Sequence, residues 1–256
     1  MELRGFMGGI YRLTEWIARF AFVNLLWLAC SLFIPLLLLM LLYAFNPEEM
    51  PEGFYFIPIA AFGAAAPFTM FPATSAMFAV IRKYVQGSED APVFKTFFKG
   101  FKENYVKSMW GGLFFVVFFF IIYFNYHFYT APESNLRVLG FLFLFLAVLA
   151  VVTMFNFFNF IVHLDVKFGQ LLKNAALMSI GSPLTSIGIL LANGVILYLS
   201  YFQITFLVPF FTGSLMAFCT YWLYDRSFNR LLEKTRKSEE DESAQHEPSE
   251  TVGTEK

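Results

Sequence analysis

Three polar side chains recur at helical spacing inside an otherwise apolar segment. Asn156, Asn159 and His163 are three and four residues apart, which places them on one face of a helix. An amide surrounded by hydrocarbon needs a hydrogen-bond partner, so this face should point into a helical bundle, either as an interhelical contact or as a ligand-binding face. The candidate partner side chains on other helices are Asn24, Asn193 and Gln203.

Two prolines mark a second place where polar groups gather within apolar sequence. Pro67 and Pro72 each leave the carbonyl four residues earlier without its helical partner, and inside lipid that carbonyl must bind another group. The sequence predicts a kinked or broken helix between Pro67 and Pro72, with Thr69 and Thr74 close by. Such a break is either a packing kink or part of a transport site. The candidate ligand-binding residues are therefore Pro67, Pro72, Thr74, Asn156 and Asn159.

Motifs that would support catalysis are missing from the sequence. It contains no GxxxxGK, HExxH or GxSxG motif and no cluster of Cys and His, and Cys30 and Cys219 both lie in apolar segments. We therefore expect a protein that is not an enzyme, without a catalytic residue, metal or cofactor. No charged residue lies near the centre of any apolar segment, which argues against a proton-driven pump.

The composition indicates a membrane protein. Apolar residues make up 58% of the chain, aromatic residues 20% and charged residues only 14%. A helix of about 20 apolar residues crosses the hydrocarbon core, and the sequence predicts an all-α bundle of six spans over residues 20–226. The spans are residues 20–45, 54–81, 108–127, 139–162, 184–201 and 206–224. The last two result from dividing one long apolar block at Ser200–Thr205, for which a re-entrant segment is the alternative.

The distribution of basic residues predicts the orientation. Of the 18 Lys and Arg residues, Arg137 alone falls in a segment assigned to the outside. Because Lys and Arg are retained on the cytoplasmic side, we expect a multi-pass plasma-membrane protein with both termini in the cytoplasm. The tail, 227–256, is acidic from about 238 and is predicted to be disordered there. Nothing in the sequence points to nucleic acid, and the oligomeric state is open.

Amphipathic segments precede three predicted hairpins, at residues 1–19, 91–107 and 166–179. In the second of them, apolar and basic residues alternate at helical spacing, with Asp90 as the expected N-cap and Pro92 in the first turn. Such a helix either anchors the protein to the leaflet or docks a partner. The candidate residues for contact with lipid or a partner are Phe94, Lys95, Phe98, Lys99, Phe101 and Lys102.

Three strings, in this order, resemble a known family. They are Asn24-Leu25-Leu26-Trp27, then Pro72-Ala73-Thr74 with Ala76 and Met77, and finally the run from Phe97 to Asn104, FFKGFKEN. Together they resemble the YesL family of bacterial integral membrane proteins, a family of unknown function, over about Gly8–Leu231. The stretch Leu36–Thr69 is longer than the compact form of that family.

The resemblance implies a role in carbohydrate uptake, because YesL family members are linked with genes for the uptake of plant-derived oligosaccharides. It implies an accessory or regulatory protein beside the permeases of sugar ABC transporters, and it transfers no functional residue. The alternative is a carrier for a small molecule or sugar fragment, which would use the Pro67 and Pro72 break and the Asn156 and Asn159 face.

Overall fold

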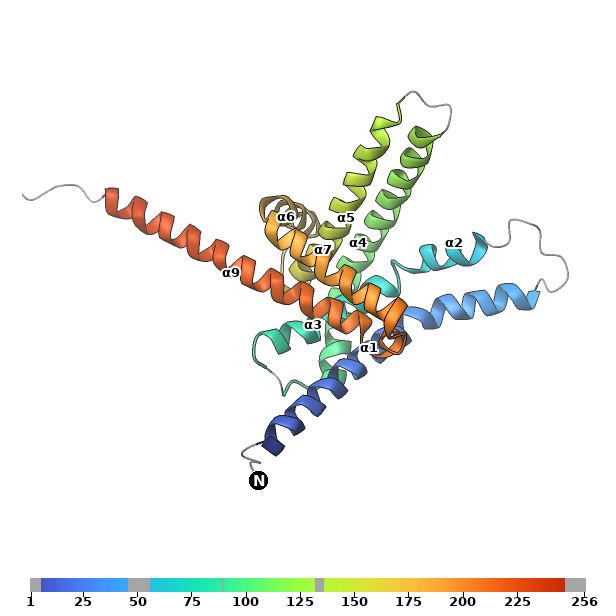
Figure 1. Cartoon of the computed structure of the whole chain (residues 1–256), viewed down its shortest axis with the longest axis horizontal. Helices are drawn as coiled ribbons and strands as arrows, with labels where there is room; N and C mark the ends of the chain where they lie inside the picture. Colours follow the sequence, from blue (N-terminus) through green and yellow to red (C-terminus); the bar gives the residue numbers. More distant parts are fainter. Residues whose placement is uncertain (1–5, 46–55, 89, 132–135, 247–256) are drawn as a thin grey trace, which may run out of the picture.

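The computed structural model describes residues 6–45, 56–88, 90–131 and 136–246. Within these ranges the fold is helical and contains no strand, which confirms the predicted all-α class. The helices, labelled in Figure 1, are α1 (Phe6–Phe45), α2 (Phe56–Ala65), α3 (Met70–Val85), α4 (Val93–Thr130), α5 (Val138–His163), α6 (Phe168–Gly181), α7 (Pro183–Tyr198), the π-helical turn η1 (Leu199–Gln203), α8 (Leu207–Phe210) and α9 (Thr212–His246).

Four helical segments of the described chain are long and apolar enough to cross a membrane, rather than the six that were predicted. They are Gly9–Leu41, Val93–Thr130, Val138–His163 and Pro183–Gln203. The predicted second span, 54–81, is divided into α2 and α3. The predicted sixth span, 206–224, is divided between α8 and the first turns of α9, whose later turns are charged.

The break between α2 and α3 lies where the prolines predicted it. Pro67 lacks an N–H group, and the chain makes a turn over residues 66–69 before α3 begins at Met70. The Thr69 hydroxyl donates to the Ala65 carbonyl at 3.1 Å, and the Phe71 N–H reaches the Ala66 carbonyl at 3.0 Å. Neighbouring groups thus bind several of the backbone carbonyls at the break.

Two of the three predicted amphipathic segments are not separate helices. Residues 6–19 continue into the first span within α1, and residues 93–107 continue into the third span within α4, because no proline interrupts either junction. The third predicted segment forms a separate helix, α6. There α6 ends at Gly181, and Ser182, held in a non-helical conformation before Pro183, turns the chain into α7.

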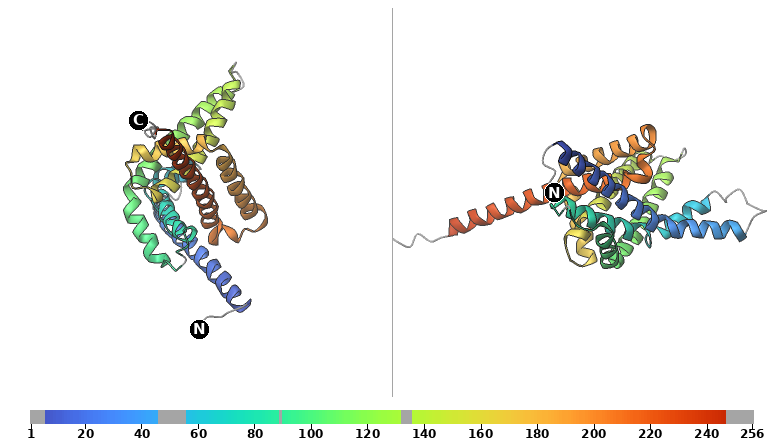
Figure 2. Two further views of the ribbon diagram at one scale, coloured as in Figure 1. Left: turned by 90° about the vertical axis from the view of Figure 1, so that its left-hand side faces the viewer. Right: turned by 90° about the horizontal axis from the view of Figure 1, so that it is seen from below.

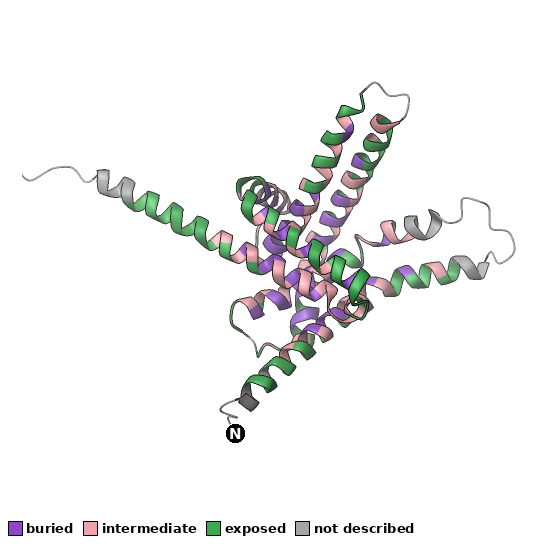
Figure 3. Ribbon diagram, in the orientation of Figure 1, coloured by how far each residue is buried: buried purple, intermediate pink, exposed green. Residues whose placement is uncertain are grey.

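The core surrounds α3, which contacts α1, α4, α5 and α9. Figure 3 shows that buried residues gather where these helices meet, whereas the far ends of α4 and α5 are exposed. Aromatic rings fill this centre: Phe158 stacks on Phe78 with 5.6 Å between ring centroids, and Phe160 meets Tyr224 edge-on at 5.1 Å. The turned views in Figure 2 show α9 projecting away from this core.

Large apolar side chains cover the outer parts of the helices. On α4 and α5 they include Phe120, Phe124, Phe128, Phe141 and Phe145, all of them exposed. Exposed apolar surface on this scale is unfavourable in water but is what a lipid environment requires. The fold therefore agrees with the membrane class predicted from composition.

The long apolar block after residue 183 is divided close to the predicted position. α7 passes into η1, the chain then turns, and α8 is followed by α9 from Thr212. Asn24 of α1 holds this region, since its amide nitrogen donates to the Pro209 carbonyl at 2.7 Å and its oxygen accepts from the Ser214 N–H at 3.1 Å. One side chain thus satisfies a carbonyl at the end of α8 and a free donor at the start of α9.

The first part of the acidic tail, as far as His246, is not disordered as predicted. α9 continues to that residue, so residues 238–246 are helical and not disordered. Charge pairs four residues apart support such a helix, as between Arg236 and Glu240 at 3.2 Å. Residues 247–256 of the predicted tail lie outside the described part of the chain.

Candidate functional site

The predicted amide face meets α6 through Asn156, and the buried side-chain oxygen of Asn159 has no hydrogen-bond partner among the described residues. Asn156 donates to the Ser179 hydroxyl at 2.9 Å, and Asn159 donates to the Asn156 side-chain oxygen at 3.3 Å, with both asparagines buried. The three predicted partners lie elsewhere: Asn24 holds α8 and α9, Asn193 donates to Thr220, and Gln203 is exposed. Ser179 was not predicted as a partner, because its only distinguishing feature in the sequence is a hydroxyl on the apolar face of α6.

The predicted helix break is closed by the protein's own groups. Pro67 and Pro72 are buried, and the Thr74 hydroxyl accepts a hydrogen bond from the Trp27 indole at 2.9 Å. Pro72 leaves the Phe68 carbonyl without a helical donor, and the Tyr105 hydroxyl of α4 donates to it at 3.2 Å. Tyr105 was not singled out for this role, because the contact joins residues far apart in the chain.

The two halves of the predicted ligand site contact different helices. Asn156 contacts Ser179 of α6, and Asn159 donates to Asn156. Pro67 instead packs against α4, where a Cβ added at Gly112 would lie 2.6 Å from the Pro67 Cα. Neither group lines the cleft described below or the two shallower cavities beside Gly181.

The first four turns of α4 present basic and aromatic side chains on a fixed support. Phe97 is fully buried, and Gly100 lies so close to α3 that a Cβ there would be 2.6 Å from that of Ala79. On the outer side, Phe94 is 59% exposed and Phe98 is 41% exposed. The basic aromatic face consists of Phe94, Lys95, Phe98, Lys99, Phe101 and Lys102, of which Phe101 alone is half-buried.

A polar cleft opens beside this face, between α3, α4 and the end of α5. Its volume is about 750 Å³, within the usual range for small-molecule sites. Its charged residues are Arg82, Lys83, Lys99, Glu103, Lys107 and Asp165, and its uncharged polar residues include Gln86, Ser88, Thr96, Asn104 and His163. We refer to it as the polar cleft.

Contacts across the polar cleft fix its walls. Arg82 of α3 donates to the Val162 carbonyl of α5, and Lys107 of α4 binds Asp165, with 2.6 Å between Nζ and Oδ1. The Lys107 ammonium lowers the pKa of the exposed Asp165 carboxyl by hydrogen bonding and by charge attraction. Lys99 lies 3.7 Å from Glu103 on its own helix. Both carboxylates of the cleft are thus paired with lysines, Glu103 with Lys99 and Asp165 with Lys107.

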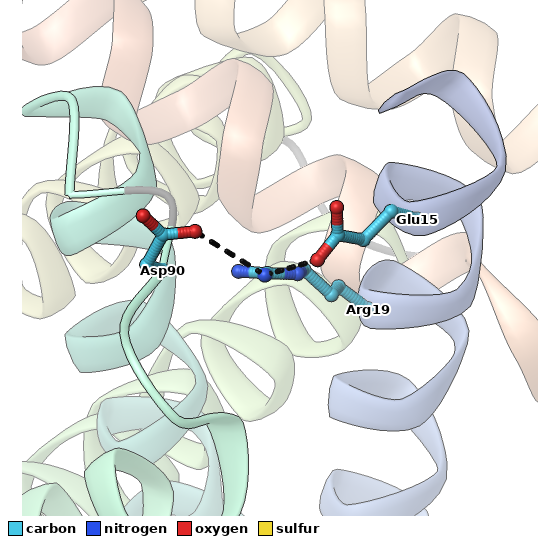
Figure 4. Close-up of polar contacts among 3 residues, drawn as sticks. All are labelled: Glu15, Arg19 and Asp90. Atoms are coloured by element: carbon cyan, nitrogen blue, oxygen red, sulfur yellow. Dashed lines mark hydrogen bonds and ion pairs between the residues drawn. The ribbon is translucent and has the colours of Figure 1, made fainter. Parts of the chain in front are cut away.

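Arg19 ties α1 to the same end of the molecule. Figure 4 shows its guanidinium between Glu15, on the preceding turn of α1, and Asp90, with 3.8 Å from Arg19 Nη2 to Asp90 Oδ1. Asp90 is therefore not the predicted N-cap, since α4 begins at Val93 after Pro92. Burial raises the pKa of Tyr84, whose ring lies 5.9 Å from the Arg19 guanidinium.

Comparison with known proteins places the chain in a family. The sequence profile of a family described as "Protein of unknown function, DUF624" matches residues 20–126. The chain is also 30% identical over 219 residues to "Uncharacterized protein YteU" of Bacillus subtilis (strain 168), covering 86% of this chain and 85% of the relative. The chain belongs to the DUF624 family. The resemblance to YesL inferred from three short strings is thereby confirmed.

Two further relatives of this DUF624 protein come from the same Bacillus subtilis strain. "Uncharacterized protein YesL" is 26% identical over 90% of the chain and 94% of the relative, and "Uncharacterized protein YesV" is 29% identical over 62% of the chain and 76% of the relative. No solved structure matches the chain. The polar cleft of this DUF624 protein had one signal in its sequence, the basic residues at 82–83 and 99–107, which predicted orientation and, for Lys99 and Lys102, contact with lipid or a partner.

Proposed function

We propose that this DUF624 protein is a non-catalytic accessory or regulatory protein of the plasma membrane, with both termini in the cytoplasm, and that it docks a membrane complex through the basic aromatic face of α4. One observation carries the proposal. Phe97 and Gly100 hold the start of α4 rigidly on α3, while Phe94 and Phe98 project outward among lysines. A surface that is already ordered loses little conformational entropy when a partner binds.

The partner proposed for this face is a permease of oligosaccharide uptake with an acidic cytoplasmic surface. The positive charge of Lys95, Lys99 and Lys102 complements an acidic surface, and the exposed phenylalanines supply apolar contacts. The link to oligosaccharides rests on the family resemblance alone. The carrier alternative is supported less well, since Trp27 and Tyr105 bind polar groups at the helix break and Asn156 pairs with Ser179, although the buried Asn159 side-chain oxygen has no hydrogen-bond partner among the described residues.

Affinity purification of the tagged protein from native membranes tests the proposal. Phe94→Ala with Phe98→Ala should lose the co-purifying permease, because both side chains are exposed; Phe98 also meets the buried Phe97 ring edge-on, so the thermal stability of the variant is measured alongside. The control is Leu231→Ala with Leu232→Ala, which removes exposed apolar side chains of α9. Recovery of the same proteins with both variants, or of none with the unaltered protein, would refute docking through α4.

If the same face only anchors the protein to the leaflet, the purification gives a different result. If the face binds only lipid, the Phe94→Ala, Phe98→Ala variant should still recover the unaltered protein's partners and should differ only in its lipids. Mass spectrometry of lipids and proteins in one preparation separates these outcomes, and this pattern would contradict the accessory function.

A further inference from the structure

We infer that the polar cleft is a binding site for a phosphate-type anion, the phosphoryl group of either an anionic phospholipid or a soluble phosphorylated molecule. The inference concerns a ligand site and goes beyond docking through α4. It rests on three observations: an excess of positive charge, an arrangement of hydrogen-bond donors, and the position of the cleft on the molecule.

The charge of the polar cleft is not balanced by its own residues. Arg82, Lys83, Lys99 and Lys107 line it, against Glu103 and Asp165. Lys107 and Lys99 pair with these two carboxylates, at 2.6 and 3.7 Å. Among the residues that the structure describes, neither Arg82 nor Lys83 lies within ion-pair distance of a carboxylate. Neither charge at the end of α3 is thus neutralised by an ion pair, and Lys83 in particular is available to an anion.

Donors suited to phosphoryl oxygens surround these two charges. The Lys83 ammonium is exposed and makes only a long contact, 3.5 Å, with the Thr96 hydroxyl. Arg82 uses Nη1 for the Val162 carbonyl and Nε for Gln86, which fixes the plane of its guanidinium. Ser88 and Thr96 add hydroxyl groups to the lining. Arg, Lys and hydroxyl donors together are the usual partners of phosphoryl oxygens.

The polar cleft lies beside a residue type that is typical of a membrane surface. On α4, Trp110 is 54% exposed and follows the cleft residue Lys107 by one helical turn, and the exposed apolar residues of the helix continue beyond it. Exposed tryptophan is typical of the boundary between head groups and hydrocarbon. A lipid head group in the leaflet and a phosphorylated solute in the cytoplasm therefore both have access to the cleft.

Thermal unfolding of the purified full-length protein tests the inference with two probes. One is inorganic phosphate, added in a zwitterionic detergent with chloride at equal ionic strength as the reference. The other is phosphatidylglycerol, added to phosphatidylcholine nanodiscs. A ligand of the folded state raises the unfolding temperature with concentration. We expect such a rise with at least one probe. A response to phosphatidylglycerol alone identifies a lipid head group, and a response to phosphate identifies a soluble ligand.

Lys83→Gln is the decisive variant, because the exposed Lys83 side chain supports no packing, whereas Arg82 also holds the Val162 carbonyl. Loss of one charge-assisted contact should weaken the response about tenfold. The matched control is Lys173→Gln, which removes the same charge from an exposed lysine of α6 outside both the cleft and the basic aromatic face and should leave the response unchanged. The inference is overturned if the folded protein responds to neither probe, or if the two variants lose the response equally.

Discussion

Single polar side chains hold this fold together where its helices break. Asn24 joins α1 to α8 and α9, and Tyr105 joins α4 to the carbonyl that Pro72 leaves free. In a membrane these groups have no water to replace a missing partner. Residues of this kind should therefore be sensitive to changes that remove one hydrogen-bonding group and little volume.

Asn24→Ala tests the junction of α8 and α9. The change leaves the Pro209 carbonyl and the Ser214 N–H without partners, and we expect the free energy of unfolding to fall by about 2–4 kcal/mol. Unfolding by steric trapping in bicelles measures the loss. Asn229→Ala, on the exposed side of α9, is the control and should change stability little. Equal losses for the two variants would contradict the anchoring role of Asn24.

Tyr105→Phe tests the closure of the helix break. It removes the donor to the Phe68 carbonyl and keeps the ring, so we expect a loss of about 0.5–1.5 kcal/mol in the same measurement. Tyr201→Phe, on an exposed tyrosine, provides the comparison. A stability unchanged by Tyr105→Phe would mean that the Phe68 carbonyl finds another donor.

The ion pair of Lys107 and Asp165 predicts a dependence on pH. The pKa of Asp165 is lowered in the folded state from its ordinary value of 3.8, so the pair stabilises the protein above that value and this effect is lost as the pH falls below it. The unaltered protein should unfold at a higher temperature than Asp165→Asn at neutral pH, and the difference should shrink on acidification. A difference that stays constant with pH would contradict the pair.

At the scale of elements, α4 organises the molecule because its glycines let neighbours approach. A Cβ at Gly111 would lie 2.4 Å from the Phe157 ring of α5, and one at Gly112 would lie 2.6 Å from the Pro67 backbone. Small residues at such contacts are typical of membrane helices. The same helix carries the basic aromatic face and one wall of the polar cleft, so its position decides both.

Gly112→Ala should displace the break between α2 and α3. Because the Cβ meets backbone and not a flexible side chain, we expect a loss of about 1–3 kcal/mol in the free energy of unfolding. Gly194→Ala is the matched control, since a Cβ there meets nothing within 4 Å and alanine favours the helix. Equal stability of the Gly112→Ala and Gly194→Ala variants would contradict the close packing of Gly112 against Pro67.

At the scale of the whole molecule, the loops assigned to the cytoplasm gather at one end. Arg19 meets Asp90, Lys107 binds Asp165, and Gln86 donates to Tyr221 at 3.4 Å. The end of α4 and the start of α5 point away from this end in Figure 1. The orientation predicted from charge requires these two ends to face opposite sides of the membrane.

Cysteine labelling in cells tests that orientation. In a background with Cys30→Ala and Cys219→Ala, a membrane-impermeant maleimide should label Leu136→Cys in intact cells. It should label Ser88→Cys only after permeabilisation. Both positions are exposed, so accessibility reports sidedness and not burial. The reverse pattern would invert the topology and place the polar cleft outside.

Local sequence was sufficient for the helical class, the break near Pro67 and the division after residue 199. Each depends on composition or on a residue that cannot continue a helix, and such effects act within a few positions. Where no such residue intervened, the prediction failed: α1 and α4 run through the expected boundaries, and α9 continues to His246.

Only the tertiary structure decided which distant groups meet. Asn156 pairs with Ser179 and not with Asn24, and the carbonyl freed by Pro72 is bound by Tyr105. The polar cleft likewise joins residues of α3 and α4 with Asp165, beyond the end of α5. Composition and helical periodicity place a side chain on the face of its own helix. They do not specify the neighbouring helix, because apolar surfaces of similar shape and charge can pack in more than one arrangement.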